Sequence, residues 1–197
     1  VVFGVLNAVV LQPLNVSDPQ SLYQLRNPRW VIGHLLTTSY PAFEDFRQRN
    51  TTFSGMAAID AYSNGSLNWH NTAKHISGDE VTGNYFDLLG VQPEAGQIFH
   101  EAAEHGPNSA PYIVLSDSLW RSAFHADASV IGTTVEFNKH PFTIIGIASA
   151  KFHGTERFVW PDYGRPMENE QQANGWDYLH DSAHVSVMVI GRLKPRV

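Results

Sequence analysis

The stretch EVTGNYFDLLGVQPEAGQIF, residues 80–99, carries the clearest structural signals in the chain and no reactive chemistry. Asn84 stands where a helix N-cap is expected, and YFDLL (85–89) supplies one to two helical turns. Gly90 is suited to end that helix in the left-handed conformation, and Pro93 prevents the helix from resuming. The stretch therefore predicts a helix, a stop and an extended segment, and it contains no His, Cys or phosphate-binding loop.

The composition fits one domain with a sizeable core or two small lobes, because the 197 residues are 43% hydrophobic and 16% charged. The formal net charge of −6 provides no basic surface, so we expect no nucleic-acid partner. The chain contains no Cys, which excludes disulfides and thiolate metal sites within it.

Short strands and short helices alternate along the chain. Alternating or β-branched apolar residues predict strands over 21–27, 56–62, 66–70, 73–81, 112–116, 133–138, 142–148 and 184–193. Capping residues and apolar spacing predict helices over 39–49 and 116–124. Turns are expected at 63–65, 71–72 and 138–141. Residues 152–183 are turn-rich and yield no assignment, and 168–175 is interpreted as an exposed polar loop.

This order of elements predicts an α+β fold, a mixed sheet with hairpins and short packed helices. It disfavours a doubly wound nucleotide-binding fold, since the elements do not form a run of βαβ units. Phe43 and Phe46 are expected on one face of the first helix, and Phe86, Leu88 and Leu89 are expected in the core.

The N-terminal stretch VVFGVLNAVVLQPL (1–14) is apolar for eleven residues apart from Gly4 and Asn7. It lacks the basic start and cleavage pattern of a secretory signal, and it is shorter than the about 20 residues that span a bilayer as a helix. Two interpretations stay open: a buried helix or strand, or the outer end of a truncated transmembrane helix. The chain also ends on RLKPRV without a structural stop, which indicates that it continues in a longer protein.

Ten His residues justify a search for a metal site. The four candidate ligands in the segment 175–184 are Asp177, His180, Asp181 and His184. They stand at i, i+3, i+4 and i+7, so they would share one face if the segment were helical. Gly175 before them and the strand predicted from 184 leave little room for such a helix. We therefore expect an exposed polar turn here in preference to a metal site.

The remaining titratable groups suggest no catalytic site and no cofactor. His100 and His105, with Glu101 and Glu104 between them, are interpreted as a solvated acidic loop. The pairs Asp79/Glu80 and Glu168/Glu170 are interpreted as solvated carboxylates in loops, with ordinary pKa values. Neither a G-x-S-x-G nucleophile turn nor a glycine-rich phosphate loop occurs in the sequence.

Six stretches carry a resemblance to a known family when taken in order. They are FGVLNAVVLQPL (3–14), SYPAFEDFRQRNTTFSGMAA (39–58), VTGNYFDLLGVQPEAGQIF (81–99), YIVLSDSLWRSAF (112–124), VIGTTVEFNKHPFTIIGIA (130–148) and VMVIGRLKP (187–195). Together they resemble the MacB-like periplasmic core domain of FtsX/MacB-type ABC transporter permeases, in particular the large duplicated permeases of acidobacteria. The resemblance extends over nearly all of the chain.

The resemblance implies an extracytoplasmic domain held by a bacterial inner membrane and facing the periplasm. Residues 1–12 would be the outer end of the first transmembrane helix, and 13–197 would be the core domain, incomplete at its C-terminus. The implied partners are an ABC ATPase subunit or domain, a second permease and a periplasmic or outer-membrane protein. The family moves its periplasmic domain by ATP hydrolysis in the cytoplasm, so the resemblance implies mechanical coupling without catalysis in this chain.

Two alternatives from other classes stay open. The first is a metal-dependent hydrolase that uses the four candidate ligands of 175–184 together with Glu168 or Glu170. The second is a periplasmic binding or sensor module that works without an ATPase.

Overall fold

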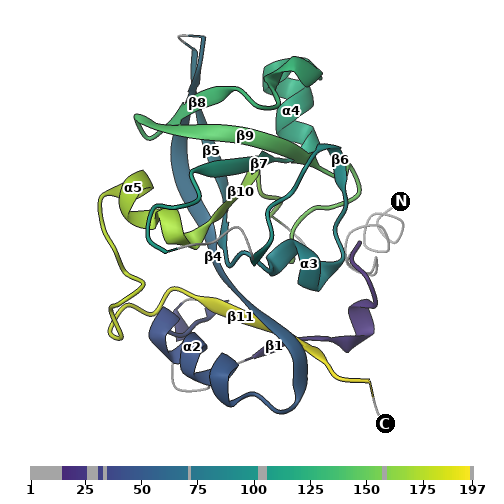
Figure 1. Cartoon of the computed structure of the whole chain (residues 1–197), viewed down its shortest axis with the longest axis vertical. Helices are drawn as coiled ribbons and strands as arrows, with labels where there is room; N and C mark the ends of the chain where they lie inside the picture. Colours follow the sequence, from purple (N-terminus) through teal and green to yellow (C-terminus); the bar gives the residue numbers. More distant parts are fainter. Residues whose placement is uncertain are drawn as a thin grey trace, which may run out of the picture.

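The structure of the protein is a computed structural model that describes residues 15–25, 31–32, 35–70, 72–101, 106–156 and 159–195. These residues form an α+β fold in which short helices pack on a mixed β-sheet, as the order of predicted elements indicates (Figure 1). Residues 1–12, predicted as the end of a transmembrane helix, lie outside the described residues. No helix within the described ranges has the length and apolar character that crossing a membrane requires.

The main sheet has the strand order β1-β11-β4-β5-β10-β7-β9-β6, and β8 pairs with both β4 and β9. Its strands are β1 (Leu22–Leu25), β4 (Phe53–Trp69), β5 (Thr72–Val81), β6 (Pro93–Gly96), β7 (Tyr112–Leu115), β8 (Thr134–Phe137), β9 (His140–Ala148), β10 (Tyr163–Pro166) and β11 (Met188–Leu193). β10 runs parallel to β5, and β7 runs parallel to β9, whereas β1 and β4 each pair antiparallel with β11. A separate pair is formed by β2 (Val31–Ile32) and β3 (Leu35–Leu36).

β4 is one long strand, so the turn predicted at 63–65 is wrong. Asp60 pairs with Glu80 and Ser63 pairs with Gly78, which leaves two residues of β4 opposite Asp79. This is a β-bulge, and Tyr62 within it has a positive φ of 63°. Gly65 serves packing and not a turn, because a Cβ atom there would lie 2.2 Å from the Phe137 ring.

Two predicted helices are confirmed as α2 (Tyr40–Arg49) and α4 (Asp117–Phe124). Ser116 caps α4, since its side chain accepts a hydrogen bond from the Leu119 N–H (3.1 Å). In α2, of the two phenylalanines predicted on one face, Phe43 is fully buried and Phe46 is 42% exposed, so only Phe43 contributes to the core.

The turn-rich region contains three elements that the sequence did not reveal: β10, the 3₁₀-helix η4 (Met167–Asn169) and α5 (Glu170–Asn174). The interpretation of 168–175 as an exposed loop is wrong, because Asn169 and Glu170 are buried. Their polar groups are satisfied inside the protein; Asn169 Oδ1, for example, accepts from the Ala110 N–H (3.0 Å).

Three groups of buried apolar side chains support the sheet. One packs beneath α4 and includes Trp120 and Phe142, and another surrounds α3 (Tyr85–Leu89). The third lies beneath α2 and includes Phe43. Figure 1 shows β4 running the length of the molecule, past α2 at one end and β8 at the other. Each end of the molecule thus has its own apolar core on a shared strand.

Candidate functional site

Helix α3 begins and ends close to the predicted positions. Asn84 occupies the N-cap position, but its side chain does not cap the helix. Its amide instead donates to the Met56 carbonyl oxygen (2.8 Å) and accepts from Thr82 Oγ1 (2.9 Å), which ties the start of α3 to β4. Gly90 ends the helix with φ 69°, as predicted. Phe86 and Leu89 are buried as expected, whereas Leu88 is only half-buried.

Arg192, in β11, joins the end of α3 to the segment 15–21, which we call the N-terminal arm. The guanidinium group donates to the Leu88 carbonyl oxygen from Nε (3.0 Å) and from Nη2 (2.7 Å). Its bonds to the arm reach the carbonyl oxygens of Ser17 (2.6 Å) and Asp18 (2.9 Å) and the Ser21 hydroxyl (2.7 Å). A guanidinium has its N–H donors in a rigid planar fork, so one side chain can fix three segments relative to one another.

Backbone contacts reinforce this meeting point. The Ser17 N–H donates to the Leu89 carbonyl oxygen (2.8 Å). A Cβ atom on Gly90 would lie 2.0 Å from Ser17 Oγ, so glycine is required there by space as well as by φ. We call the set Ser17, Asp18, Ser21, Leu88, Gly90 and Arg192 the Arg192 junction. Apart from Gly90, none of its residues was singled out for this role by the sequence.

The four candidate metal ligands do not share a helix face, because 177–184 consists of turns and irregular backbone. His180 Nδ1 lies 3.0 Å from Asp177 Oδ2, but Asp181 Oδ1 accepts from the Ala183 N–H (2.8 Å). The His184 ring packs against the rings of Trp176 and Tyr178. The spacing argument for a hydrolase therefore fails.

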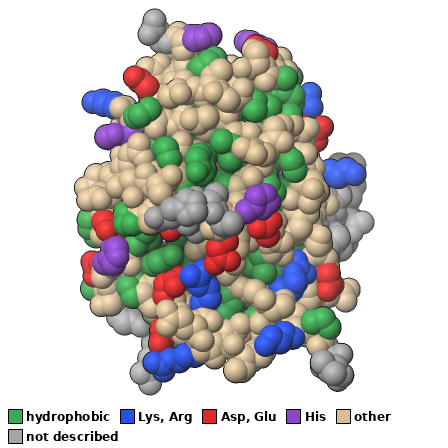
Figure 2. Space-filling model, in the orientation of Figure 1, with side chains coloured by type: hydrophobic (Ala, Val, Ile, Leu, Met, Phe, Trp, Pro, Cys, Tyr) green, Lys and Arg blue, Asp and Glu red, His purple; other side chains and the backbone are tan. Residues whose placement is uncertain are grey.

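The rest of the described chain offers no substitute, since no group of three or more His, Asp and Glu residues there is arranged to hold a metal ion. The His side chains visible in Figure 2 lie apart from one another, and Lys and Arg are interspersed with Asp and Glu on that face. His100 Nδ1 pairs with Asp87 Oδ1 (2.7 Å) and Glu101 pairs with Arg47 (3.1 Å), while 104 and 105 lie outside the described residues.

A buried charged centre lies beside β5, where the sequence suggested solvated loops. Arg165 is fully buried, and its Nη2 contacts both Glu80 and Glu170. Glu80 also accepts from the hydroxyl groups of Ser63 and Tyr178. The interpretation of Glu80 and Glu170 as solvated carboxylates is therefore wrong. The sequence did contain one indication against a solvated loop, because the predicted strand 73–81 includes Asp79 and Glu80.

The two carboxyl groups of the buried centre have pKa values that shift in opposite directions. Burial raises the pKa of Glu80 well above its usual value, against the influence of Arg165 and with the help of Glu170. For Glu170, burial is outweighed by its hydrogen bond with Glu80 and by Arg165, so its pKa is lowered. These opposite directions favour the negative charge that faces Arg165 on Glu170 over Glu80.

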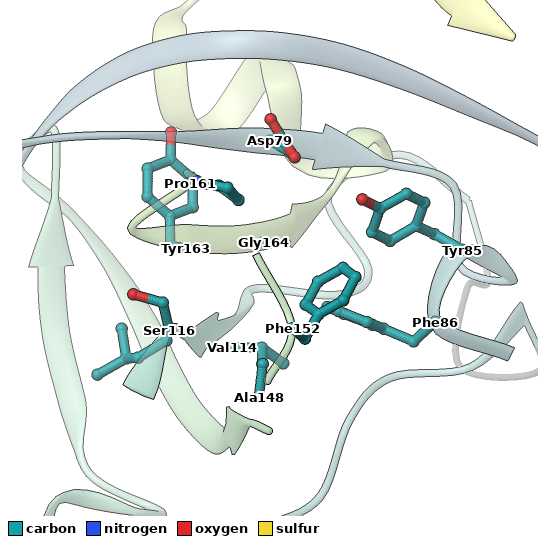
Figure 3. A pocket seen from close by; sticks show the side chains of 11 residues that line it. Asp79, Tyr85, Phe86, Val114, Ser116, Ala148, Phe152, Pro161, Tyr163 and Gly164 are labelled. Atoms are coloured by element: carbon teal, nitrogen blue, oxygen red, sulfur yellow. The ribbon is translucent and has the colours of Figure 1, made fainter. Parts of the chain in front are cut away.

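Asp79 faces the other side of β5, into a small apolar cavity of about 20 Å³ (Figure 3). Phe86, Phe152 and Tyr163 line this cavity, and the Tyr85 hydroxyl is directed toward the Asp79 carboxyl group. Burial, and then the neighbouring Glu156, raise the pKa of Asp79 to about 7, although the Tyr62 backbone N–H stabilises the carboxylate. The space fits a single water molecule and no larger ligand.

Comparison with known proteins identifies the family. The sequence model of the family described as "MacB-like periplasmic core domain" matches residues 1–196. A macrolide export ATP-binding/permease protein MacB of Neisseria gonorrhoeae is 32% identical over 85 residues, which is 43% of this chain and 13% of that protein. The MacB protein of Escherichia coli K12 is 26% identical over 114 residues, 56% of this chain and 17% of that protein. The matched part is thus a small share of these relatives' length.

Solved structures share the fold at low identity. The periplasmic region of MacB from Actinobacillus actinomycetemcomitans matches with a TM-score of 0.66 and 16% identity, covering 89% of this chain and 74% of that one. The extracellular domain of the noncanonic ABC-type transporter YknZ from Gram-positive bacteria matches with a TM-score of 0.60 and 12% identity, covering 88% and 82% of the two chains. At such identities the likeness establishes the fold alone.

Proposed function

Because the chain belongs to the MacB-like periplasmic core domain family, we propose that it is the extracytoplasmic domain of an ABC transporter permease and works by mechanical coupling. ATP hydrolysis takes place on a separate subunit or domain in the cytoplasm, and the resulting helix movement reaches this domain across the inner membrane. The domain faces the periplasm and itself catalyses no reaction. A second permease and a periplasmic or outer-membrane protein are its proposed partners.

The Arg192 junction is the observation that carries this proposal. In the proposed arrangement residues 1–12 are the outer end of a transmembrane helix, and the N-terminal arm follows them directly. The arm, α3 and β11 are held at one guanidinium by five hydrogen bonds. A displacement of the arm therefore moves α3 and β11 together, because none of the three can shift without breaking hydrogen bonds to the Arg192 guanidinium group.

Helix α3 passes the movement onward through packed side chains. Phe86 meets Phe99 and Phe152 edge to face, with ring centroids 5.0 and 6.0 Å apart. Leu89 is fully buried in the same apolar group, which also contains Ile59 of β4 and Ile190 of β11. Close-packed interiors transmit displacement because they have little free volume to absorb it. This supports a role for residues 80–99 as a rigid corner.

The test uses the full-length protein that contains this chain, purified with its ATPase and reconstituted in lipid. A fluorescent label at Thr72→Cys reports movement of the β4–β5 hairpin. These 197 residues contain no Cys of their own, and any Cys elsewhere in the full-length protein is replaced first. We expect Arg192→Gln to retain ATP hydrolysis and to lose the ATP-dependent fluorescence change. The matched control is Arg121→Gln, which removes an exposed arginine whose contacts with Asp117 and with the Trp120 ring both lie on α4.

The outcomes separate the parts of the proposal. If no ATPase co-purifies with the wild-type protein, the transporter assignment fails. If Arg192→Gln keeps the full fluorescence change, the junction does not transmit movement. Urea unfolding of both variants, measured in parallel, shows whether a lost signal comes from a lost fold.

A further inference from the structure

Asp79 lies between two small cavities and is only 8% exposed. The first is the cavity of about 20 Å³ beside Phe86, and the second, of about 10 Å³, is lined by Tyr62 and Glu156 among others. Each has room for about one water molecule. An ionised carboxylate needs more hydration than this space holds, so a negative charge on Asp79 is unfavourable unless the surroundings open.

The β-bulge of β4 is directed at this carboxyl group. Ala61 and Tyr62 are the two residues that stand opposite Asp79, and the Tyr62 backbone N–H stabilises the carboxylate. Tyr62 has a φ of 63°, a conformation that is unfavourable for any residue with a Cβ atom. An unfavourable backbone conformation that is kept beside a buried acid is typical of a functional position.

The residues 152–156, which we call the cover segment, close the space over Asp79. Phe152 packs edge to face on Phe86 of α3, with ring centroids 6.0 Å apart. A Cβ atom on Gly154 would lie 3.6 Å from Asp79 Oδ2, so the backbone passes close to the carboxyl group. Within the described part of the chain, none of the four residues after Phe152 forms a backbone hydrogen bond with the sheet. The cover segment can therefore separate from α3 more easily than a paired strand can.

The charges around Asp79 are negative. Glu156, on the cover segment, and Asp60, on β4, both disfavour a carboxylate at Asp79. Among the described residues that line the two cavities there is no Lys, Arg or His, and Arg157 lies outside the described residues. The nearby phenol groups stay neutral, because burial raises their pKa values. They belong to Tyr62, Tyr85 and Tyr163.

We infer that Asp79 is a proton-binding site that controls the contact between the cover segment and α3. With a proton on Asp79 the space is uncharged, and Phe152 packs on α3. Without that proton the carboxylate is repelled by Glu156 and draws in water, which loosens the cover segment. Neither ATP nor the proposed coupling is needed for this response.

The direction of the pH response follows from the two states of the cover segment. In the closed state the pKa of Asp79 is raised to about 7, and in an opened, hydrated state a pKa near 4 is expected. The closed state therefore holds more protons between about pH 4 and 7, and opening becomes easier as the pH rises through this range. Above about pH 7 both states are ionised, so opening changes little further.

The experiment is hydrogen exchange, followed by mass spectrometry, on the full-length protein in lipid from pH 5 to 8 without ATP. Dividing the intrinsic exchange rate at each pH by the observed rate gives a protection factor. Peptides that cover 149–156 report the cover segment, where the Phe152 N–H donates to the Ser149 carbonyl oxygen (2.8 Å). Peptides from α4 are the reference for unfolding of the whole domain.

Three variants are compared with the wild type. Asp79→Asn is neutral at every pH, and Glu156→Gln removes the neighbouring charge while it keeps Asp79. The matched control is Glu136→Gln, which neutralises an exposed acid on β8 that lines neither cavity.

We expect the protection factor of the cover segment to fall at least about tenfold from pH 5 to 7 in the wild type and in Glu136→Gln, and to level off by pH 8. It should stay constant in Asp79→Asn. In Glu156→Gln it should level off at a lower pH, because Glu156 no longer raises the pKa of Asp79.

Two results would overturn the inference. The first is a protection factor that does not change with pH in the wild type, or that falls equally in Asp79→Asn. The second is a cover segment as protected as α4 at every pH, because it would then open only when the whole domain unfolds.

Discussion

Arg165 and Arg192 show two ways in which this domain uses a guanidinium group. Arg165 is fully buried, and its Nη2 faces the carboxyl groups of Glu80 and Glu170. Its Nε and Nη1 have no hydrogen-bond partner among the described residues. Arg192 is half-buried and uses Nε, Nη1 and Nη2, and every acceptor it meets is a neutral carbonyl or hydroxyl oxygen.

The comparison indicates that positive charge is what matters at Arg165, whereas the geometry of the hydrogen-bond donors is what matters at Arg192. Arg165 compensates buried acidic groups, so its positive charge matters more than the number of its hydrogen bonds. Arg192 meets no acidic side chain at the junction, so what matters there is the shape of the fork that reaches three segments. The charged centre should therefore govern stability, and the junction should govern how parts of the chain move together.

The largest effect is expected from Arg165→Met. Removal of one partner of a buried ion pair leaves carboxyl groups without compensation, and we expect a loss of up to about 5 kcal/mol in the free energy of unfolding. Arg192→Met should cost about 1–2 kcal/mol, because its neutral acceptors can bind water instead. Urea unfolding of both variants measures the two values.

A double variant tests whether Arg165 stabilises the protein through its charge. In Arg165→Met combined with Glu170→Gln, the negative charge of Glu170 that Arg165 balances is removed as well. Recovery of much of the lost stability is expected. If Arg165→Met alone is no more harmful than Arg192→Met, the distinction between charge and geometry is wrong.

The next largest expected effect is a pH dependence of the free energy of unfolding. It should come from buried acidic groups and not from the Arg192 junction. With its pKa raised to about 7, Asp79 is protonated more readily in the folded than in the unfolded chain, where a pKa near 4 is expected. Its contribution to stability is complete below about pH 4, declines as the pH rises and is lost above about pH 7, for a total on the order of 4 kcal/mol. Unfolding free energies measured from pH 4 to 8 check this.

Substitution of Asp79 tests whether its carboxyl group causes this pH dependence. Asp79→Asn should flatten much of the slope between pH 4 and 7, although Glu80 and Asp60, whose pKa values are raised as well, keep a residual slope of the same sign. Arg192→Gln should leave the slope intact. A slope unchanged in Asp79→Asn would show that another group carries it.

The smallest effect concerns the backbone of the junction. Gly90→Ala places a methyl group against Ser17 at a positive φ, whereas at Gly175, with φ 78°, no atom lies within 4 Å of the added group. The conformational cost of about 1–2 kcal/mol applies to both, and only Gly90→Ala adds a collision. Thermal unfolding should therefore rank Gly90→Ala below Gly175→Ala. Equal melting temperatures would show that the arm moves aside freely.

Local signals in the sequence were sufficient for many elements. The helix of 85–89 ends at a glycine, and the hairpin of β8 and β9 turns at Asn138 and Lys139, as predicted. These features depend on neighbouring residues alone. The turn at 63–65 failed because Gly65 is needed by the Phe137 ring, a contact between distant strands that the local sequence does not contain.

The candidate sites depended still more on distant contacts. Nothing near Arg192 in the sequence indicates Leu88 or Ser17 as its partner, since the pairing of β1 with β11 brings them together. The prediction that Glu170 is a solvated carboxylate is wrong because its buried partners lie on β5 and β10. A polar residue whose hydrogen-bond partners lie on distant strands cannot be distinguished from a solvated residue in a single sequence. Such residues make up both the Arg192 junction and the buried charged centre.

The position of β11 between β1 and β4 has a consequence for the synthesis of the protein. Leu22, near the start, pairs with Arg192, near the end, and Ile59 pairs with Met188. A growing chain therefore holds β1 without its neighbour and β4 with an open edge until nearly the last of these residues is made. Open edges and exposed apolar faces favour aggregation. β11, the last of these described strands along the chain, thus completes this sheet and the Arg192 junction in one step, so a chain that ends before β11 would lack both.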